Sequence, residues 1–385
     1  MSIRRFILSI VAFALILPAV KLSAQSTLRP DDPNLPDDYV TVSILVAEPG
    51  GALYSLAGHV AIRMQCPYHG LDYVFSYESE DASKKVLSYL TGRLKMGLGA
   101  ILPEDYLAPY AEDGRGVKEY KVNMPLSARQ NLWRILDGHL EEGMELPYEY
   151  LERGCAQSTV RFLKEGLDTI PIVYGGFPEH FRLTRREITG RQLGRYPWTW
   201  TFMNLICNKP IDDICSREQK IIMPADFVEV MSRATVCGQP LLEAPVQVLE
   251  SKSTPEPAGI TPLHVSLVIL LLTVLCGAFG RREMLYVLLA IQTLLGAVST
   301  YLVFFSSLCC TEWSWLLVPF NLLPLIFWKW RRYWQVPFGA VCLIWALVMS
   351  LLPHMVTDWP YIVLAVAVGA SYIMTNYIKN KAIAK

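Results

Sequence analysis

The chain has 385 residues, with 35 basic and 35 acidic residues and a formal net charge of zero at pH 7. The sequence lacks a basic patch with interleaved aromatic residues, which argues against a nucleic-acid-binding protein. Hydrophobic residues make up 52% of the chain, a content raised by six apolar segments.

The N-terminus has the features of a secretory signal peptide. Arg4 and Arg5 precede an apolar run over residues 6–20, and Leu22-Ser23-Ala24 fits the small-residue pattern of a cleavage site. We expect residues 1–24 to be removed and the following region to be exported. The alternative is an uncleaved anchor, for which the apolar run is short.

The other apolar segments all follow residue 260, and each is a candidate membrane span. They lie at residues 263–279, 284–305, 315–328, 336–352 and 361–377. The third is short and is broken by Pro319 and Pro324. We therefore expect an all-α bundle of five transmembrane helices over residues 262–385.

The basic residues between these segments predict the orientation. They follow the first, third and fifth spans, whereas the connections at 306–314 and 353–360 contain no Lys or Arg; the basic residues are Arg281, Arg282, Lys329, Arg331, Arg332, Lys379, Lys381 and Lys385. The positive-inside rule makes these clusters cytoplasmic. The protein is thus expected in the cytoplasmic (inner) membrane, with its C-terminus in the cytoplasm and residue 261 on the periplasmic side.

The region between signal peptide and bundle is expected to form an exported domain over residues 25–245, followed by a linker over 246–261. Residues 251–262, SKSTPEPAGITP, have the Ser- and Pro-rich composition of a linker. Five cysteines lie in the exported region, where disulfides can form. We expect two of Cys207, Cys215 and Cys237 to pair.

The pattern of this region predicts an α+β fold. Residues 39–46, 59–64, 73–77 and 118–123 are expected strands, and a turn around His69-Gly70 joins the second to the third. Apolar residues at helical spacing predict helices over 126–141 and 155–167. Strands with a hairpin, flanked by helices, indicate a compact α+β domain.

Two residues of this domain are candidates for nucleophilic catalysis. Cys155 follows Gly154 and opens a predicted helix, whose free N–H groups favour a thiolate. His59 starts a strand and can serve as a general base. Taken singly, each has a plainer interpretation: Cys155 as a buried thiol or half of a disulfide, and His59 as a structural histidine.

Several segments resemble the Lnb-type lipoprotein N-acyltransferase family. Residues 49–63, PGGALYSLAGHVAIR, resemble its "PG…LYS.FGH..IR" signature, and Tyr148-Glu-Tyr150 followed by Cys155 resembles its "Y.Y…DNC.TR" segment. The resemblance covers about residues 40–170, and the five spans resemble the membrane domain that accompanies the family. Departures occur at Arg153-Gly154 and Gln157-Ser158, and at Ser76 and Glu78, where the family commonly has Asn and Gly.

The resemblance implies an acyltransferase with a thioester on Cys155 and His59 as its base. It also places Tyr77 and Arg115 in shared segments, where we expect them to bind substrate. The implied acceptor is the α-amino group of a lipoprotein's N-terminal cysteine, and the partners are lipoproteins or lipids of the outer leaflet. The order of His and Cys resembles circularly permuted papain-like enzymes. No cofactor and no metal are expected.

Two other functions stay open from the residues. The same Cys/His pair can work with water as a cell-envelope hydrolase or peptidase. Alternatively, Cys155 lies in a disulfide and the domain is a non-catalytic binding module.

Overall fold

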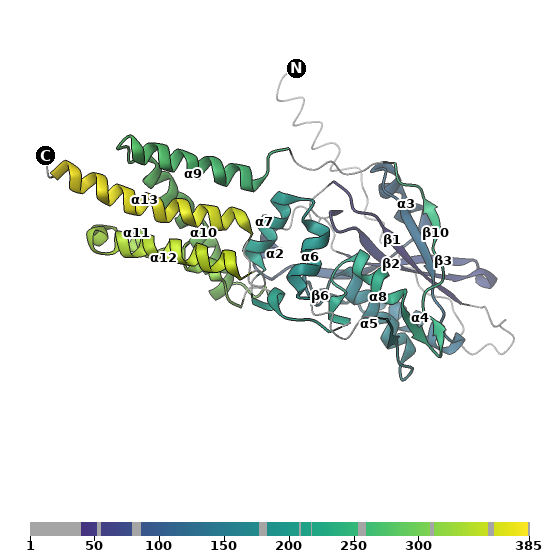
Figure 1. Ribbon diagram of the computed structural model, residues 1–385. Helices are drawn as coiled ribbons and strands as arrows, with labels where there is room; N and C mark the ends of the chain where they lie inside the picture. Colours follow the sequence, from purple (N-terminus) through teal and green to yellow (C-terminus); the bar gives the residue numbers. More distant parts are fainter. Residues whose placement is uncertain are drawn as a thin grey trace, which may run out of the picture.

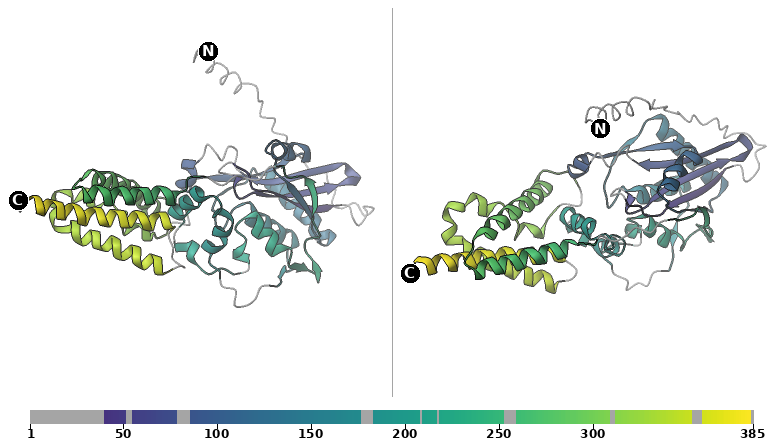
Figure 2. Two further views of the ribbon diagram at one scale, coloured as in Figure 1. Left: turned by 45° about the horizontal axis from the view of Figure 1, so that its top comes forward. Right: turned by 90° about the horizontal axis from the view of Figure 1, so that it is seen from above.

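The computed structural model describes residues 40–51, 55–78, 86–176, 183–207, 209–216, 218–252, 259–308, 312–352 and 358–383. The predicted signal peptide lies outside these residues. The described chain forms an α+β part and a helical part that extends from one of its ends (Figures 1 and 2).

A seven-stranded sheet forms the centre of the α+β part. Its strand order is β10-β5-β1-β2-β3-β4-β6, and all neighbouring strands pair antiparallel. The strands are β1 (Thr41–Ala47), β2 (His59–Cys66), β3 (Leu71–Glu78), β4 (Lys95–Ile101), β5 (Val117–Lys121), β6 (Glu145–Pro147) and β10 (Val246–Leu249). The predicted strands and hairpin are present, and the hairpin turn consists of the 3-10 helix η2 (Pro67–His69) and Gly70, whose φ is +63°.

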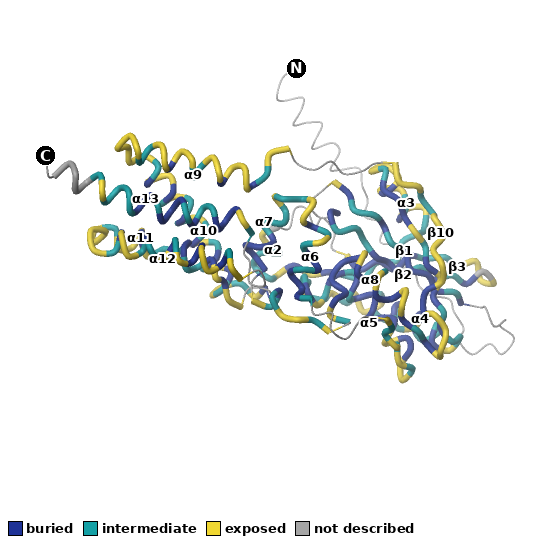
Figure 3. The backbone as a smooth tube through the Cα atoms, viewed as in Figure 1, coloured by how far each residue is buried: buried dark blue, intermediate teal, exposed yellow. Residues whose placement is uncertain are grey.

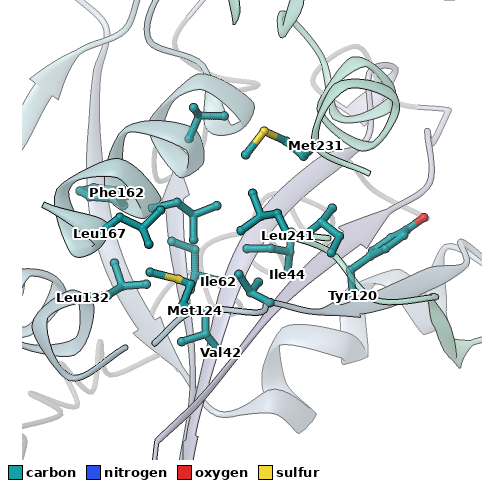
Figure 4. Packing of buried hydrophobic residues seen from close by; sticks show 14 of the residues in the cluster. Val42, Ile44, Ile62, Tyr120, Met124, Leu132, Phe162, Leu167, Met231 and Leu241 are labelled. Atoms are coloured by element: carbon teal, nitrogen blue, oxygen red, sulfur yellow. The ribbon is translucent and has the colours of Figure 1, made fainter. Parts of the chain in front are cut away.

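Helices cover both faces of this sheet. On one face, α4 (Leu126–Glu141) and α5 (Cys155–Leu167) pack over the largest core cluster, which includes Ile62, Leu132 and Phe162 (Figure 4). On the other face, α3 (Pro103–Glu112) packs its Tyr106 and Tyr110 against Ala47, Ala61 and Val74. Both predicted helices have the expected bounds, because their apolar residues recur at helical spacing.

The region after α5 completes the same core. It contains β7 (Val173–Tyr174), α6 (Arg185–Leu193), α7 (Pro197–Ile206), η4 (Lys209–Asp212), η5 (Glu218–Lys220), α8 (Pro224–Met231), β8 (Ala234–Val236) and β9 (Gln239–Pro240). Phe227, Met231 and Leu241 lie in the main core cluster beside Ile44 and Ile62. The region is therefore an integral part of the domain.

Two sequence expectations for this part need correction. Strand β10 lies in the stretch predicted as a linker, and it pairs with β5 at the edge of the sheet. The domain therefore extends beyond residue 245. The expected disulfide is also absent from the described residues, because Cys207, Cys215 and Cys237 are free thiols. Cys207 is buried in an apolar cluster, whereas Cys237 is exposed in the turn after β8.

The helical part contains α9 (Pro262–Ala278), α10 (Glu283–Phe304), α12 (Arg331–Leu351) and α13 (Trp359–Ile383). In the described chain, three stretches are long and apolar enough to cross a membrane: Glu283–Phe304, Trp328–Leu351 and Trp359–Ile378. The shorter apolar helix α9 leaves most of its surface exposed (Figure 3).

The expected bundle of five transmembrane helices is not confirmed, because the third segment is not one helix. It consists of η7 (Trp315–Leu317), turns, α11 (Leu323–Ile326) and η8 (Trp328–Trp330). Proline lacks the N–H that a helix interior requires, and Pro319 lies in the break. The Gln292 side chain of α10 donates a hydrogen bond of 2.8 Å to the Pro319 carbonyl, so the broken backbone is satisfied inside the protein.

The α+β part rests on one end of the bundle through α7 and the short helix α2 (Val86–Leu90). Ser306, after α10, donates a 2.6 Å hydrogen bond to the Leu90 carbonyl. The Trp198 indole of α7 donates to the Ile260 carbonyl at 2.7 Å, and the Tyr361 hydroxyl donates to the Thr201 carbonyl at 2.8 Å. These contacts fix the domain against the N-terminal ends of α9 and α13 and the C-terminal end of α10.

Candidate active site

His59 and Cys155 each start an element of regular structure. His59 is the first residue of β2 and follows Gly58, whose φ of +83° suits glycine. A Cβ atom on Gly58 would lie 2.5 Å from the Ala47 carbonyl oxygen, so this turn requires glycine. Cys155 is the first residue of α5, where the helix N-terminus provides unpaired N–H groups.

The two residues meet where the sheet opens between β2 and β3. The β2–β3 ladder runs from Cys66–Leu71 only as far as Ile62–Phe75, although β3 continues to Glu78 beside β4. Side chains alternate along a strand, so Ser76 and Glu78 lie on the α3 face of β3, opposite to Phe75 and Tyr77. Cys155 reaches the opening from the α5 face and forms a hydrogen bond with the His59 side chain.

The environment favours the thiolate form of Cys155. Burial alone would raise the pKa of this thiol, but the His59 charge and hydrogen bond and the backbone N–H groups of Val60 and Ala156 outweigh it and lower the pKa below its ordinary value. Burial alone would lower the pKa of His59, but the Cys155 charge and hydrogen bond, with the Glu78 carboxylate, raise it. The two groups thus stabilise each other as a thiolate–imidazolium pair.

Two side chains of β3 hold the imidazole from its other side. The Ser76 hydroxyl is fully buried and lies 2.8 Å from His59 Nε2. Glu78 Oε2 lies 4.0 Å from the same nitrogen, and its side chain is half-exposed. With Nε2 held by Ser76, the ring can direct Nδ1 toward the thiol.

Arg115 lies at the edge of the site, but its contacts are with the protein. The guanidinium is buried, its Nε donates a 2.8 Å hydrogen bond to the Glu48 carbonyl, and it lies 4.6 Å from the centre of the Tyr110 ring. Its charge also acts on the His59 imidazole. The residue predicted to bind substrate therefore supports the turn that precedes His59.

Tyr77, the other residue predicted to bind substrate, points to the α5 face of the sheet. Its ring packs edge-on against Phe162 at 6.5 Å, and its hydroxyl lies 3.5 Å from the Leu146 carbonyl. Burial raises the pKa of its hydroxyl to about 12. It is therefore a packing residue behind the nucleophile helix.

Ser76, Tyr106 and Tyr110 are site residues that the sequence did not predict. The two tyrosine hydroxyls lie 3.4 Å apart in the core beneath α3, and burial raises the pKa of both, with smaller contributions from the charges of Glu78 and Cys155. For Ser76, a signal was available in the sequence. Ser76 and Glu78 flank Tyr77 on the predicted strand that follows the strand of His59, so both were expected on one face of it.

The start of the nucleophile helix is held by Gln157. Its Oε1 accepts a 3.0 Å hydrogen bond from the Gly154 N–H, and its Nε2 donates to the carbonyls of Leu151 at 3.2 Å and Ile222 at 3.3 Å. A Cβ atom at position 154 would lie 2.7 Å from that Oε1. Gly154 and Gln157 thus form one arrangement, in which the Gln157 side chain satisfies the N–H of the N-cap residue and ties the helix start to two neighbouring carbonyls.

The loops that carry both reactive residues pack against a membrane helix. Leu56, three residues before His59, and Leu151, four residues before Cys155, share a buried cluster with Leu302 of α10 and Leu308 after it. The reactive pair is therefore anchored to the end of the bundle that faces the α+β part.

Fold and site together define a membrane protein whose α+β domain carries a paired cysteine and histidine at its opened sheet. Within the described chain, no group of three or more His, Cys, Asp or Glu side chains could hold a metal ion.

Residues 32–173 match the family model described as the Lnb N-terminal periplasmic domain. Residues 32–173 are therefore an Lnb-type periplasmic domain, as the sequence indicated, and both His59 and Cys155 lie inside the matched region. No curated protein and no solved structure matches the chain. The permuted papain-like fold is accordingly not confirmed.

Proposed function

We propose that this protein is a membrane-tethered cysteine acyltransferase that moves an acyl chain to the N-terminal cysteine amine of lipoproteins. The observation that carries the proposal is the Cys155–His59 pair, which is electrostatically coupled and anchored through Leu56 and Leu151 to the bundle end. An acyl ester in a bilayer has its carbonyl near the headgroups, so a nucleophile held at the end of a membrane bundle can reach that carbonyl. The match to the Lnb N-terminal periplasmic domain agrees with the sequence resemblance from which this substrate class was expected.

The chemistry takes two steps. The Cys155 thiolate attacks the carbonyl carbon of the ester, the C–O bond breaks, and the His59 imidazolium gives its proton to the leaving alcohol, which yields a thioester. The acceptor amine then attacks the thioester, loses a proton to His59, and releases the thiolate as the amide forms. Ser76 keeps the imidazole oriented in both steps.

The proposed orientation places the α+β domain in the periplasm and the C-terminus in the cytoplasm. The third apolar segment then crosses the membrane as a series of short helices, η7, α11 and η8. The α9–α10 connection, α11 and the C-terminal end lie at the bundle end away from the α+β part (Figure 1). The basic residues Arg281, Arg282, Lys329, Arg331 and Arg332, which follow the first and third segments, belong to that end, in agreement with the positive-inside rule. We also infer a permuted papain-like arrangement from the His strand that precedes the Cys helix.

A hydrolase is the second candidate, and the half-exposed Glu78 beside His59 favours it, since this edge of the site is open to water. A non-catalytic module is less favoured, because Cys155 is a free thiol and its pKa is lowered.

Complementation of a bacterial strain that lacks lipoprotein N-acylation tests the proposal. Wild-type protein should restore N-acylated lipoprotein cysteines, detected by mass spectrometry, whereas Cys155→Ala and His59→Ala should not. His69→Ala and His139→Ala are matched controls, since these residues lie in η2 and α4, and both should complement. Free amines with accumulating lyso-lipid would instead identify a hydrolase, and full activity of Cys155→Ala would refute the mechanism.

A further inference from the structure

Two helices of the α+β domain, α2 and α7, lie at the end of the bundle and leave large apolar side chains exposed there (Figure 1). Leu87 of α2 is 73% exposed, and Trp198 of α7 is 51% exposed. Single exposed apolar residues are ordinary on a protein surface. The position of these two relative to the membrane helices therefore decides what they indicate.

Trp198 lies level with the first residues of α9 and α13. Its indole N–H donates a 2.7 Å hydrogen bond to the carbonyl of Ile260, just before α9 begins. One turn further along α7, the Thr201 carbonyl accepts a 2.8 Å hydrogen bond from Tyr361 in the first turn of α13. Ile260 and Trp359 are exposed beside these contacts. The domain and the bundle thus present exposed apolar side chains at the same level.

Leu87 lies level with the last residues of α10. Its carbonyl accepts a 3.0 Å hydrogen bond from the Thr91 N–H, and the Thr91 carbonyl accepts a 3.1 Å hydrogen bond from the Ser307 hydroxyl. Ser307 follows α10, whose last residue is Phe304. Phe304 and Phe305 are both exposed. Leu87 is therefore about one helical turn from the point where α2 contacts the bundle.

The exposed apolar side chains form a belt at the end of the bundle that faces the α+β domain. The belt has members on two domain helices and on the outer connections of the bundle: Leu87, Trp198, Ile260, Phe305, Trp313 and Trp359. Where a bundle crosses a bilayer, this level is the headgroup and ester layer. Tryptophan is enriched in that layer, because its ring is apolar and its N–H is polar.

Two exposed arginines accompany the domain's part of the belt. Arg93 follows α2, and its N–H donates a 2.8 Å hydrogen bond to the carbonyl of Ser88, the neighbour of Leu87. Arg195 precedes α7, and its guanidinium lies 5.1 Å from the centre of the Tyr196 ring. Guanidinium groups bind phosphate oxygens in pairs. Apolar side chains edged by arginines match the phosphates and esters of a lipid surface.

We propose that the exposed sides of α2 and α7 are immersed in the headgroup and ester layer of the outer leaflet. Leu87 and Trp198 enter the ester layer, and Arg93 and Arg195 bind lipid phosphates. The α+β domain is then a membrane-surface domain in its own right. The inference rests on the membrane-spanning orientation of the proposed function but does not require acyl transfer.

Photo-crosslinking of the full-length protein tests this surface. The protein is reconstituted into vesicles of phosphatidylethanolamine and phosphatidylglycerol, with a diazirine-bearing amino acid in place of Leu87 or Trp198. The matched controls are Tyr68, which is 68% exposed in η2 at the other end of β2 from His59, and Val246, which is 67% exposed on β10. We expect at least about tenfold more lipid adduct from positions 87 and 198, because interfacial side chains lie among the lipids.

Two results would overturn the proposal. One is equal lipid labelling at all four positions. The other is adducts from positions 87 and 198 that join two copies of this chain, which would make the face a protein interface.

A charge-reversal experiment connects the surface with the reactive pair. In vesicles that contain a diacylglyceryl lipopeptide, Leu87→Glu combined with Trp198→Glu should slow acylation of Cys155 about tenfold, because two apolar side chains no longer enter the ester layer. Alkylation of Cys155 by iodoacetamide, which is soluble in water, should be unchanged, and Tyr68→Glu should alter neither rate. Acylation of the double variant at the wild-type rate would also contradict the immersed face.

Failure of the proposed function has a different signature. In that case the wild-type protein forms no thioester on Cys155, as seen in its intact mass, whereas the lipid adducts at positions 87 and 198 are still obtained. The crosslinks also decide the matter if the double variant loses its fold and its alkylation slows, because they are made without the charged substitutions.

Discussion

Replacement of Gln157 should uncouple the nucleophile helix from its surroundings. Gln157→Ala removes three hydrogen bonds, to Gly154, Leu151 and Ile222. At about 1 kcal/mol for each net hydrogen bond, the domain should lose about 3 kcal/mol. For a domain of this size, that loss lowers the unfolding midpoint by about 6–12 °C. Alkylation of Cys155 by iodoacetamide should slow as well, because the first turn of α5 presents the sulfur to Val60 and His59.

Gln157→Glu refines this prediction. The carboxylate still accepts from the Gly154 N–H but places an oxygen against two carbonyl oxygens, so we expect a loss of at least about 2 kcal/mol. Gln130→Ala on α4 is the matched control and should stay within about 0.5 kcal/mol of wild type. Thermal unfolding and the mass of alkylated Cys155 report the two effects. If Gln157→Ala matches the control in both measurements, Gln157 does not position the nucleophile.

Three other predictions concern the reactive pair and a buried acid. Alkylation of Cys155 should reach half its maximal rate below pH 9.0, the ordinary pKa of a thiol. His59→Gln should shift that midpoint to higher pH, because burial then raises the pKa of the thiol without an imidazolium to lower it. An unshifted midpoint would show that His59 does not lower the pKa of Cys155. Ser76→Ala should lower the rate of Cys155 acylation and leave KM unchanged, since Ser76 contacts the imidazole ring, and a change in KM alone would contradict this role. Burial raises the pKa of Asp226 from 3.8 to about 7. The folded state therefore binds the proton more tightly than the unfolded state, and stability should fall as pH rises from about 4 to 7, by about 4 kcal/mol in total. Asp226→Asn should flatten this dependence in unfolding measured between pH 5 and 8, and an unchanged slope would assign it to other groups.

The sequence predicted those elements whose own residues determine their structure. Helices α4 and α5 have apolar residues at helical spacing, and β1 is rich in β-branched residues. Strand β4 was missed because Gly97 and Gly99 weaken its pattern. Helix α3 was missed because it contains Pro109, a residue that disfavours a helix interior. These two elements form only because the sheet provides an edge and a face for them.

The site was predictable to the same extent. His59 and Cys155 were found from a motif and from the position of Cys155 at a helix start. The contact of Gln157 with the Ile222 carbonyl joins residues 65 positions apart, so no local pattern could indicate it. The roles expected for Tyr77 and Arg115 came from shared segments, and both side chains turn out to contact the protein itself.

Four of the departures from the family pattern form two pairs of neighbours in the structure. Gly154 and Gln157 contact each other through the hydrogen bond from the Gly154 N–H to Gln157 Oε1. Ser76 and Glu78 both lie beside Nε2 of His59, at 2.8 and 4.0 Å. Since both sets converge on Cys155 and His59, the geometry of the pair can persist while its supporting groups differ.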